Sequence, residues 1–293
     1  VMPPDIRAAP TEKELKQAFR LKAQKEPERY YPVGVLQEEG FTRRRCARCG
    51  NYFWSVAERE VCGEPECSGG YTFIGRSPAR AKLGYVETWQ RFAEMFRGLG
   101  YTPIPRYPVV ARWRDDTYFV QASIYDFQPY CVSGELDPPA NPLVVPQFCL
   151  RFNDTDNVGI TGRHYTGFVM IGQHTFQKAE NYRPQEYLRH IYRWLTEGMG
   201  LPKEEIQFHE DAWAGGGNMG PSMEFFSRGL EIGNQVYMQY DIKSGAPKEL
   251  KIKVLDMGMG QERPAWFTNG TRTSYEATFP TVVEKLYKAT GIK

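Results

Sequence analysis

The chain has 293 residues, a length that favours one large domain with at most a small extension. Hydrophobic residues make up 41% and charged residues 25% of the sequence, which is typical of a folded globular protein and excludes a mostly disordered or collagen-like chain. The formal net charge of +2 excludes a wholly basic nucleic-acid-binding coat but leaves room for a local basic patch. No stretch approaches the roughly 18 consecutive apolar residues of a membrane span, so we expect a cytoplasmic protein without a membrane segment.

The N-terminal segment combines an amphipathic helix with a basic run. Residues 11–26 predict a helix in which Thr11 is the N-cap and Leu15, Phe19 and Leu21 lie on or beside one face. The run of three arginines at positions 43–45 is typical of a solvated face, with contact to a phosphate as the alternative.

Four cysteines gather between positions 46 and 67, in the order Cys46, Cys49, Cys62 and Cys67. Two close pairs joined by a short aromatic strand can arrange four thiolates as a tetrahedron, which is the geometry of closed structural Zn²⁺ sites. The alternative is four reduced and unrelated thiols. Four sulfur ligands leave no open coordination position, so a bound zinc is expected to brace the fold rather than to catalyse. The two remaining cysteines, at positions 131 and 149, are expected to be small buried hydrophobes.

After a connector over residues 72–80, the chain is expected to form a helix over 85–99 and then mainly strands. Runs of β-branched and aromatic residues, separated by Pro, Gly, Asn and Asp, predict strands over 119–124, 144–152, 165–172, 222–233, 235–242 and 250–256. One helix over 184–198 interrupts them. A single helix among six strands is unlike repeated βαβ units, so we expect an α+β fold with a mostly antiparallel sheet flanked by helices.

Three further segments suit the binding of an anion or a small molecule. Residues 151–157 and 161–165 predict a hairpin whose Arg and His donors converge on a phosphate or carboxylate, the alternative being a hairpin with surface ion pairs. Residues 213–221 contain three consecutive glycines, which let a backbone approach a ligand or hinge over it. Residues 255–263 place two glycines between a strand and a helix start, with Arg263 one turn in. Each pattern alone is unspecific.

Read in order, these segments agree with one family. The zinc-ribbon sequence CARCGNYFW with CGEPEC, then RYPVVARWRDD, ASIYDFQPYCVSGE, RFNDTDNVGITGRHYTGFVMIGQHTF, WAGGGNMGPSMEFFSRGLEIGNQVYMQY and LDMGMGQER follow one another along about nine tenths of the chain. In content and order the chain resembles the N-terminal part of archaeal-type alanyl-tRNA synthetases, which are class II aminoacyl-tRNA synthetases.

The resemblance implies a class II antiparallel sheet flanked by helices, with a small N-terminal zinc ribbon. Motif 1 would correspond to residues 85–113, motif 2 to residues 147–172 and motif 3 to residues 249–268. The domains expected on this basis are an extension over residues 1–75, which holds the first helix and the four-cysteine ribbon, and a catalytic domain over residues 76–293.

For ATP, the resemblance implies two catalytic arginines. Arg151 matches the motif 2 arginine that grips the α-phosphate and the substrate carboxylate, where negative charge builds during the reaction. Arg263 matches the motif 3 arginine near the γ-phosphate. Phe168 matches the aromatic residue on which adenine stacks. The remaining residues expected to bind ATP are Asn153, His164, Met170, Gly258 and Gly260.

For the amino acid, the resemblance implies that Asp256 binds the α-ammonium group. The pocket around the methyl side chain is expected to be formed by Ile124, Trp213, Asn234 and Val236. Glu224 is a candidate Mg²⁺ ligand. The histidines at positions 174, 190 and 209 match no catalytic position, so we interpret them as surface or packing residues.

The implied reaction is ATP-dependent activation of alanine to alanyl-adenylate, with Mg²⁺, followed by transfer to the 3′ end of tRNA(Ala). The alternative is a free-standing paralogue that activates another small amino acid or binds a ligand without charging tRNA. In the family, tRNA-recognition and editing regions follow motif 3, so we expect both to lie outside these 293 residues.

Overall fold

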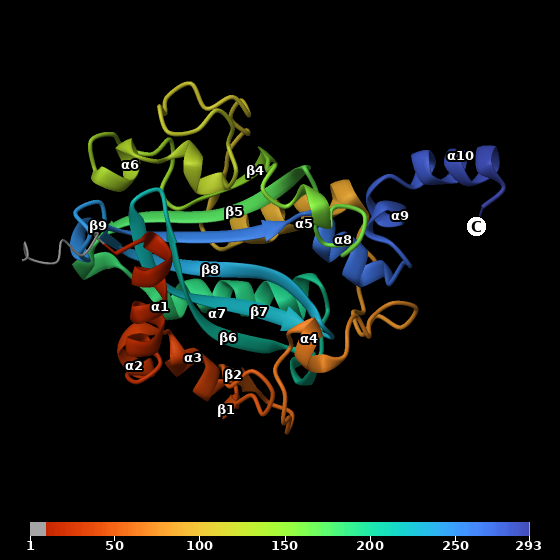
Figure 1. Ribbon diagram of the computed structural model, residues 1–293, viewed down its shortest axis with the longest axis horizontal. Helices are drawn as coiled ribbons and strands as arrows, with labels where there is room; N and C mark the ends of the chain where they lie inside the picture. The colour runs from red at the N-terminus through yellow and green to blue at the C-terminus, as the bar shows by residue number, and fades with distance from the viewer. Residues whose placement is uncertain (1–9, 293) are drawn as a thin grey trace, which may run out of the picture.

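A computed structural model describes residues 10–292, and its centre is a nine-stranded sheet in the order β1-β2-β6-β7-β8-β9-β5-β4-β3 (Figure 1). The strands are β1 Thr42–Arg45, β2 Tyr52–Ser55, β3 Thr102–Pro103, β4 Leu143–Leu150, β5 Gly167–Lys178, β6 Gln207–Gly215, β7 Asn218–Ser227, β8 Leu230–Asp241 and β9 Lys248–Gly260. The α-helices are α1 Glu12–Ala23, α2 Pro27–Tyr30, α3 Val33–Glu38, α4 Pro65–Ser68, α5 Tyr85–Gly98, α6 Tyr130–Ser133, α7 Pro184–Arg193, α8 Glu262–Asn269, α9 Ser274–Thr278 and α10 Pro280–Thr290. No helix within residues 10–292 is long and apolar enough to cross a membrane.

The sheet confirms the expected α+β fold. Every strand pair is antiparallel except β3 and β4. One face is covered by α7, where the side chain of Gln235 on β8 donates to the backbone of Tyr187 at 3.1 Å. Helix α5 packs behind the same face, with Phe92 at 5.0 Å from Trp194 between ring centres. The opposite face carries the cavity described below.

The three central hairpin strands follow the chain without interruption because two tight turns join them. Gly216 and Gly217, both with positive φ, connect β6 to β7, and Arg228 and Gly229, also with positive φ, connect β7 to β8. Two-residue turns with positive φ at both positions match the twist of a hairpin. The glycine-rich segment is therefore a hairpin turn, not a hinge over a ligand, and the run 222–233 is two strands rather than one.

The expected strand over residues 119–124 is wrong. A single bridge joins Val110 to Phe119, and Ser123–Asp126 form a 3₁₀ helix, η1. The carbonyl of Gln121 accepts from Arg151 Nε at 2.8 Å instead of from a neighbouring strand. In residues 119–124 a backbone carbonyl therefore accepts a hydrogen bond from a side chain instead of from a strand. The periodicity of the sequence does not reveal this.

The N-terminal segment is continuous with the sheet. Thr11 caps α1 as expected, and Phe19 is buried, whereas Leu21 is 52% exposed and lies off the packed face. Strand β2 pairs with β6, so the sheet runs across residue 75. Arg43 is neither a free surface charge nor a phosphate ligand, because its guanidinium pairs with buried Glu210 at 2.6 Å.

Candidate functional site

An open cavity of about 260 Å³ lies on the sheet face opposite α7. It is formed by the β4–β5 connection, the start of β5, the end of β6, the first half of β8, the end of β9 and the start of α8. The residues that line it are Ala122, Arg151, Asp154, Arg163, His164, Tyr165, Phe168, Met170, Trp213, Glu231, Gly233, Asn234, Val236, Asp256, Gly258, Gly260, Glu262 and Arg263.

Arg151 enters the cavity directly after β4. Its Nε hydrogen bond to Gln121 and its position 5.0 Å from the centre of the Phe168 ring hold the guanidinium plane. Burial lowers the pKa of Arg151, because the protein around the guanidinium replaces part of its hydration. An anion with two oxygens would supply the solvation that the side chain has lost.

Arg263 lies at the first turn of α8 and donates to Glu231 through both the backbone oxygen, at 2.9 Å, and the carboxylate, at 3.0 Å. Arg163 also lines the cavity, so three arginines face one space. Burial, followed by the charge of Arg163, lowers the pKa of His164, and this ring is therefore neutral near pH 7. The arginines make this side of the cavity suited to a polyanion.

The other side of the cavity is acidic and apolar. Asp256 lies in the middle of β9, directly opposite Val236 on β8, and is 6% exposed. Burial raises the pKa of Asp256 to about 7, although the charge of Arg151 acts in the opposite direction. Asn234 lines the same wall, and its buried Oδ1 has no hydrogen-bond partner among the described residues. Together with Trp213, these side chains form a small pocket with one carboxylate.

Glycines on β9 make the cavity possible. The sulfur of Met170 on β5 lies 2.8 Å from the position that a Cβ of Gly258 would occupy. A side chain there would push Met170 out of the wall that it forms with Phe168. The two glycines predicted for the nucleotide site, Gly258 and Gly260, both line the cavity.

Three predicted site residues do not line the cavity. Asn153 lies outside the lining, and Ile124 is fully buried, in one cluster with Val236. The carboxylate of Glu224 on β7 lies near Glu64 and His209, with ligand atoms within 4.8 Å of one another. Burial and neighbouring carboxylates raise the pKa of Glu224 well above its usual value.

Glu231 and Glu262 are among the cavity residues that the sequence interpretation did not assign. Glu231 lies in the run 222–233, which was expected to form one strand. A turn divides this run, so the sequence did not indicate that Glu231 lies at the start of β8. Glu262 accepts hydrogen bonds from the Tyr85 hydroxyl and the Val169 backbone, both at 3.0 Å, and so anchors the start of α8 beside Arg263. In the sequence, the position of Glu262 next to Arg263 could have indicated that Glu262 belongs to the site.

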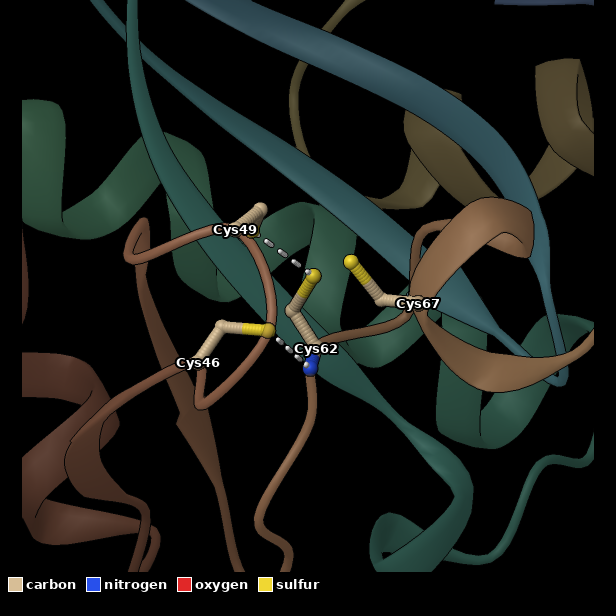
Figure 2. A group of neighbouring side chains, drawn as sticks. All are labelled: Cys46, Cys49, Cys62 and Cys67. Carbon is tan, nitrogen blue, oxygen red and sulfur yellow. Dashed lines mark hydrogen bonds between the residues drawn. The ribbon is translucent and has the colours of Figure 1, made fainter.

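The four cysteines of the ribbon converge (Figure 2). Their sulfur atoms lie within 4.8 Å of one another, and those of Cys49 and Cys62 are 3.7 Å apart. That separation is far too long for a disulfide and matches the edge of a tetrahedron whose Zn–S bonds are about 2.3 Å. The backbone of Cys62 also donates to the sulfur of Cys46 at 3.3 Å, which stabilises a thiolate. The cluster therefore fits a zinc ion.

Of the three histidines interpreted as surface or packing residues, all are buried. His190 lies 3.1 Å from the Tyr101 hydroxyl on the α7 face, and His209 accepts from the backbone of Gly63 at 3.1 Å. His174 lies behind Asp256.

Comparisons with known proteins identify the family of the chain. The family model described as tRNA synthetases class II (A) matches residues 87–290, which is more than half of the chain. The alanine–tRNA ligase of Methanocella arvoryzae is 55% identical over 285 residues, which are 96% of this chain and 33% of that relative. The alanine–tRNA ligase of Nitrosopumilus maritimus is 46% identical over 269 residues, 91% of this chain and 30% of the relative.

Among solved structures, pyrrolysyl-tRNA synthetase from Desulfitobacterium hafniense has a TM-score of 0.46 and 14% identity, over 68% of this chain and 74% of that one. The chain thus spans about a third of the length of the curated relatives it matches. From the family match over residues 87–290 and the relatives of 46% and 55% identity over more than 90% of the chain, we conclude that the chain belongs to the class II (A) tRNA synthetase family.

Proposed function

We propose that this chain activates alanine with ATP to form alanyl-adenylate and pyrophosphate. One observation carries the proposal: a single cavity has arginines on one side and a lone carboxylate beside a small apolar pocket on the other. The first side suits a nucleoside triphosphate and the second suits a small amino acid. The names of the relatives support alanine as that amino acid.

In this reaction the alanine carboxylate attacks the α-phosphorus of ATP, and pyrophosphate leaves. We assign Arg151 to the α-phosphate and the attacking carboxylate, and Arg263 to the γ-phosphate. Both guanidinium groups act by stabilising charge that increases on the phosphate oxygens, so no side-chain nucleophile is needed. Adenine would stack on Phe168 and contact Met170, and His164 and Asn153 remain candidates for the triphosphate.

For the amino acid, we assign the α-ammonium group to Asp256. Trp213, Val236 and Asn234 would surround the methyl group, with Ile124 supporting Val236 from behind. A pocket of this kind discriminates against one missing methylene by only about 1 to 3 kcal/mol. Glycine and serine are therefore expected as weak substrates.

Mg²⁺ would neutralise part of the triphosphate charge when bound. We propose Glu231 as its main protein ligand, because this carboxylate lines the cavity beside Arg263 and oxygen ligands suit the ion. Glu224 on the neighbouring strand is the second candidate.

Three further assignments accompany the main one. We propose that the four cysteines bind one structural Zn²⁺ ion, and that residues 1–75 are an extension sharing its sheet with a catalytic domain over 76–293. We also propose that the alanyl group passes to the 3′ end of tRNA(Ala). Recognition of that tRNA and editing would then depend on parts of the longer relatives outside the matched third.

ATP–pyrophosphate exchange over a panel of amino acids tests the proposal. We expect exchange with alanine, weaker exchange with glycine and serine, and none with larger amino acids. Substitution Arg151→Ala should lower alanine-dependent exchange by at least about 10²-fold with an unchanged melting temperature. The matched control is Arg193→Ala, since Arg193 is half-exposed, lies outside the cavity and pairs with Glu197 one turn away.

Exchange that survives Arg151→Ala would contradict the role given to this arginine. Exchange with a different amino acid, or none with any, would contradict alanine activation. Charging of tRNA(Ala) by the same preparation then separates a complete activity from activation alone.

A further inference from the structure

A buried histidine lies directly behind the carboxylate assigned to the substrate ammonium group. His174 on β5 is the Cα partner of Asp256 on β9, and its Nδ1 lies 3.6 Å from Asp256 Oδ1 and 3.3 Å from the Leu255 carbonyl. Its Nε2 lies 3.0 Å from the hydroxyl of Ser123 in η1. Hydrogen bonds therefore link Ser123 to His174 and His174 to the Leu255 carbonyl, and this series lies against the Asp256 carboxylate.

The order Ser, His, Asp also occurs in hydrolase triads, but this series cannot act as one. Ser123 and His174 are both 0% exposed, and neither lines the cavity. A nucleophilic hydroxyl must reach its substrate, so a hydrolytic role is excluded by burial. The series instead supports Asp256 from the side away from the substrate.

The direction of each hydrogen bond follows from the chemistry of the partners. Burial lowers the pKa of His174 to about 3, so the ring is neutral and has one donor and one acceptor nitrogen. The Leu255 carbonyl can only accept, and Nδ1 must therefore carry the proton. It follows that Nε2 accepts from the hydroxyl of Ser123.

The glycine at position 172 leaves the room that this arrangement needs. A Cβ on Gly172, two residues before His174, would overlap both His174 Nε2 and Ser123 Oγ. The ring of Phe127 packs against the imidazole at 5.2 Å between ring centres. The sheet thus leaves room for the Ser123–His174 contact and closes the space around it, so the imidazole has one orientation.

We propose that His174, oriented by Ser123, is a positioning residue that directs the Asp256 carboxylate toward the ammonium group of the amino acid substrate. This inference rests on the proposed function. A lysine or arginine behind Asp256 would neutralise the carboxylate and compete with the substrate ammonium group. A neutral imidazole instead fixes the backbone next to Asp256 through its hydrogen bond to the Leu255 carbonyl, packs beside the carboxylate and adds no competing positive charge.

The test compares steady-state kinetics of ATP–pyrophosphate exchange in three variants of the chain. His174→Leu should raise KM for alanine about fivefold, the effect of losing the one neutral hydrogen bond that holds the backbone beside Asp256. KM for ATP and kcat should stay within about twofold, because the ammonium interaction is the same in ground and transition states. Ser123→Ala should raise KM for alanine less, and His174→Asn, whose amide N–H can replace Nδ1–H, should recover most of the loss.

His190→Leu is the matched control, because His190 is also buried and hydrogen-bonded but lies on the α7 face of the sheet, away from Asp256. It should leave KM for alanine unchanged. Equal changes in KM for alanine and for ATP in His174→Leu, or the same change in His190→Leu, would refute the positioning role.

If His174→Leu does not fold, Ser123→Ala tests the inference in its place, because this change removes one oxygen atom and adds no new group. An unchanged KM for alanine in Ser123→Ala then refutes the inference. Absence of alanine-dependent exchange in the unaltered chain refutes the proposed function and this inference together. Normal exchange with unaffected variants refutes the inference alone.

Discussion

Substitution of Asp256 by Asn should stabilise the chain while removing its affinity for alanine. Burial raises the pKa of Asp256 from 3.8 to about 7, so its ionised form is less favourable in the folded chain than in the unfolded one. At pH 8 the cost is about 4 kcal/mol, from 1.36 kcal/mol for each pKa unit. Asn has nearly the same shape and carries no charge, so Asp256→Asn removes this cost.

The dependence on pH has a definite sign. Between pH 3.8 and about 7 the folded chain binds more protons at Asp256 than the unfolded chain, so its contribution to stability falls as pH rises. The gain from Asp256→Asn is therefore about 4 kcal/mol at pH 8 and about 2 kcal/mol at pH 5. The groups that face Asp256 do not reverse this trend, since His174 stays neutral and Arg151 stays charged throughout the range.

Urea denaturation of the unaltered chain and of Asp256→Asn at both pH values measures the gain, and alanine-dependent exchange measures the loss of function. We expect the urea midpoint of the variant to exceed that of the unaltered chain, and by more at pH 8 than at pH 5. A variant that is less stable at pH 8, or whose advantage is larger at pH 5, would show that Asp256 is not a destabilising buried charge.

Three further expectations concern the ribbon and the sheet. The chain should contain close to one zinc per molecule by metal analysis, and Cys62→Ser should lose that zinc and lower the melting temperature, whereas Cys131→Ser, outside the cluster, should keep it. Gly217→Ala should lower the free energy of unfolding by about 1 to 2 kcal/mol because φ is positive there, whereas Gly98→Ala, in a helix with open space at Cβ, should not lower it. Glu210→Ala should cost about 3 to 5 kcal/mol in urea denaturation, since it leaves a half-buried guanidinium without its partner. A cost below 1 kcal/mol would refute this last expectation.

Local patterns predicted the regular elements well where one face packs and the other does not. The helices over 85–99 and 184–198 and the strands β4, β5 and β9 lie where their periodicity indicated. The turn at Arg228 and Gly229 was missed because arginine at positive φ is rare, and nothing local reveals the two bonds to Glu205 that hold its side chain. Strand β6 was missed because the glycines of its turn dominated the pattern.

The cavity itself was not predictable from spacing. Arg151, Trp213 and Asp256 are far apart in the chain, and only the strand order β6-β7-β8-β9-β5-β4 brings them to one face. Residue types also fail to distinguish Val236, which lines the cavity, from Ile124, which lies behind it. The assignment of these positions came from resemblance to a family, and physical reasoning could add their roles only once the register was known.

The two sides of the cavity are built from different parts of the sheet, and this suits the two proposed substrates. Asp256 lies within β9 with a paired neighbour on each side, so its carboxylate is held to a small ligand of fixed size. Arg151 and Arg263 lie where the chain leaves β4 and β9, at the open margin. A rigid interior favours discrimination between amino acids that differ by one methylene, whereas an open margin lets a bulky, charged product leave. Because both sides share β9, the same strand sets the distance between the proposed ammonium site at Asp256 and the proposed phosphate site at Arg263.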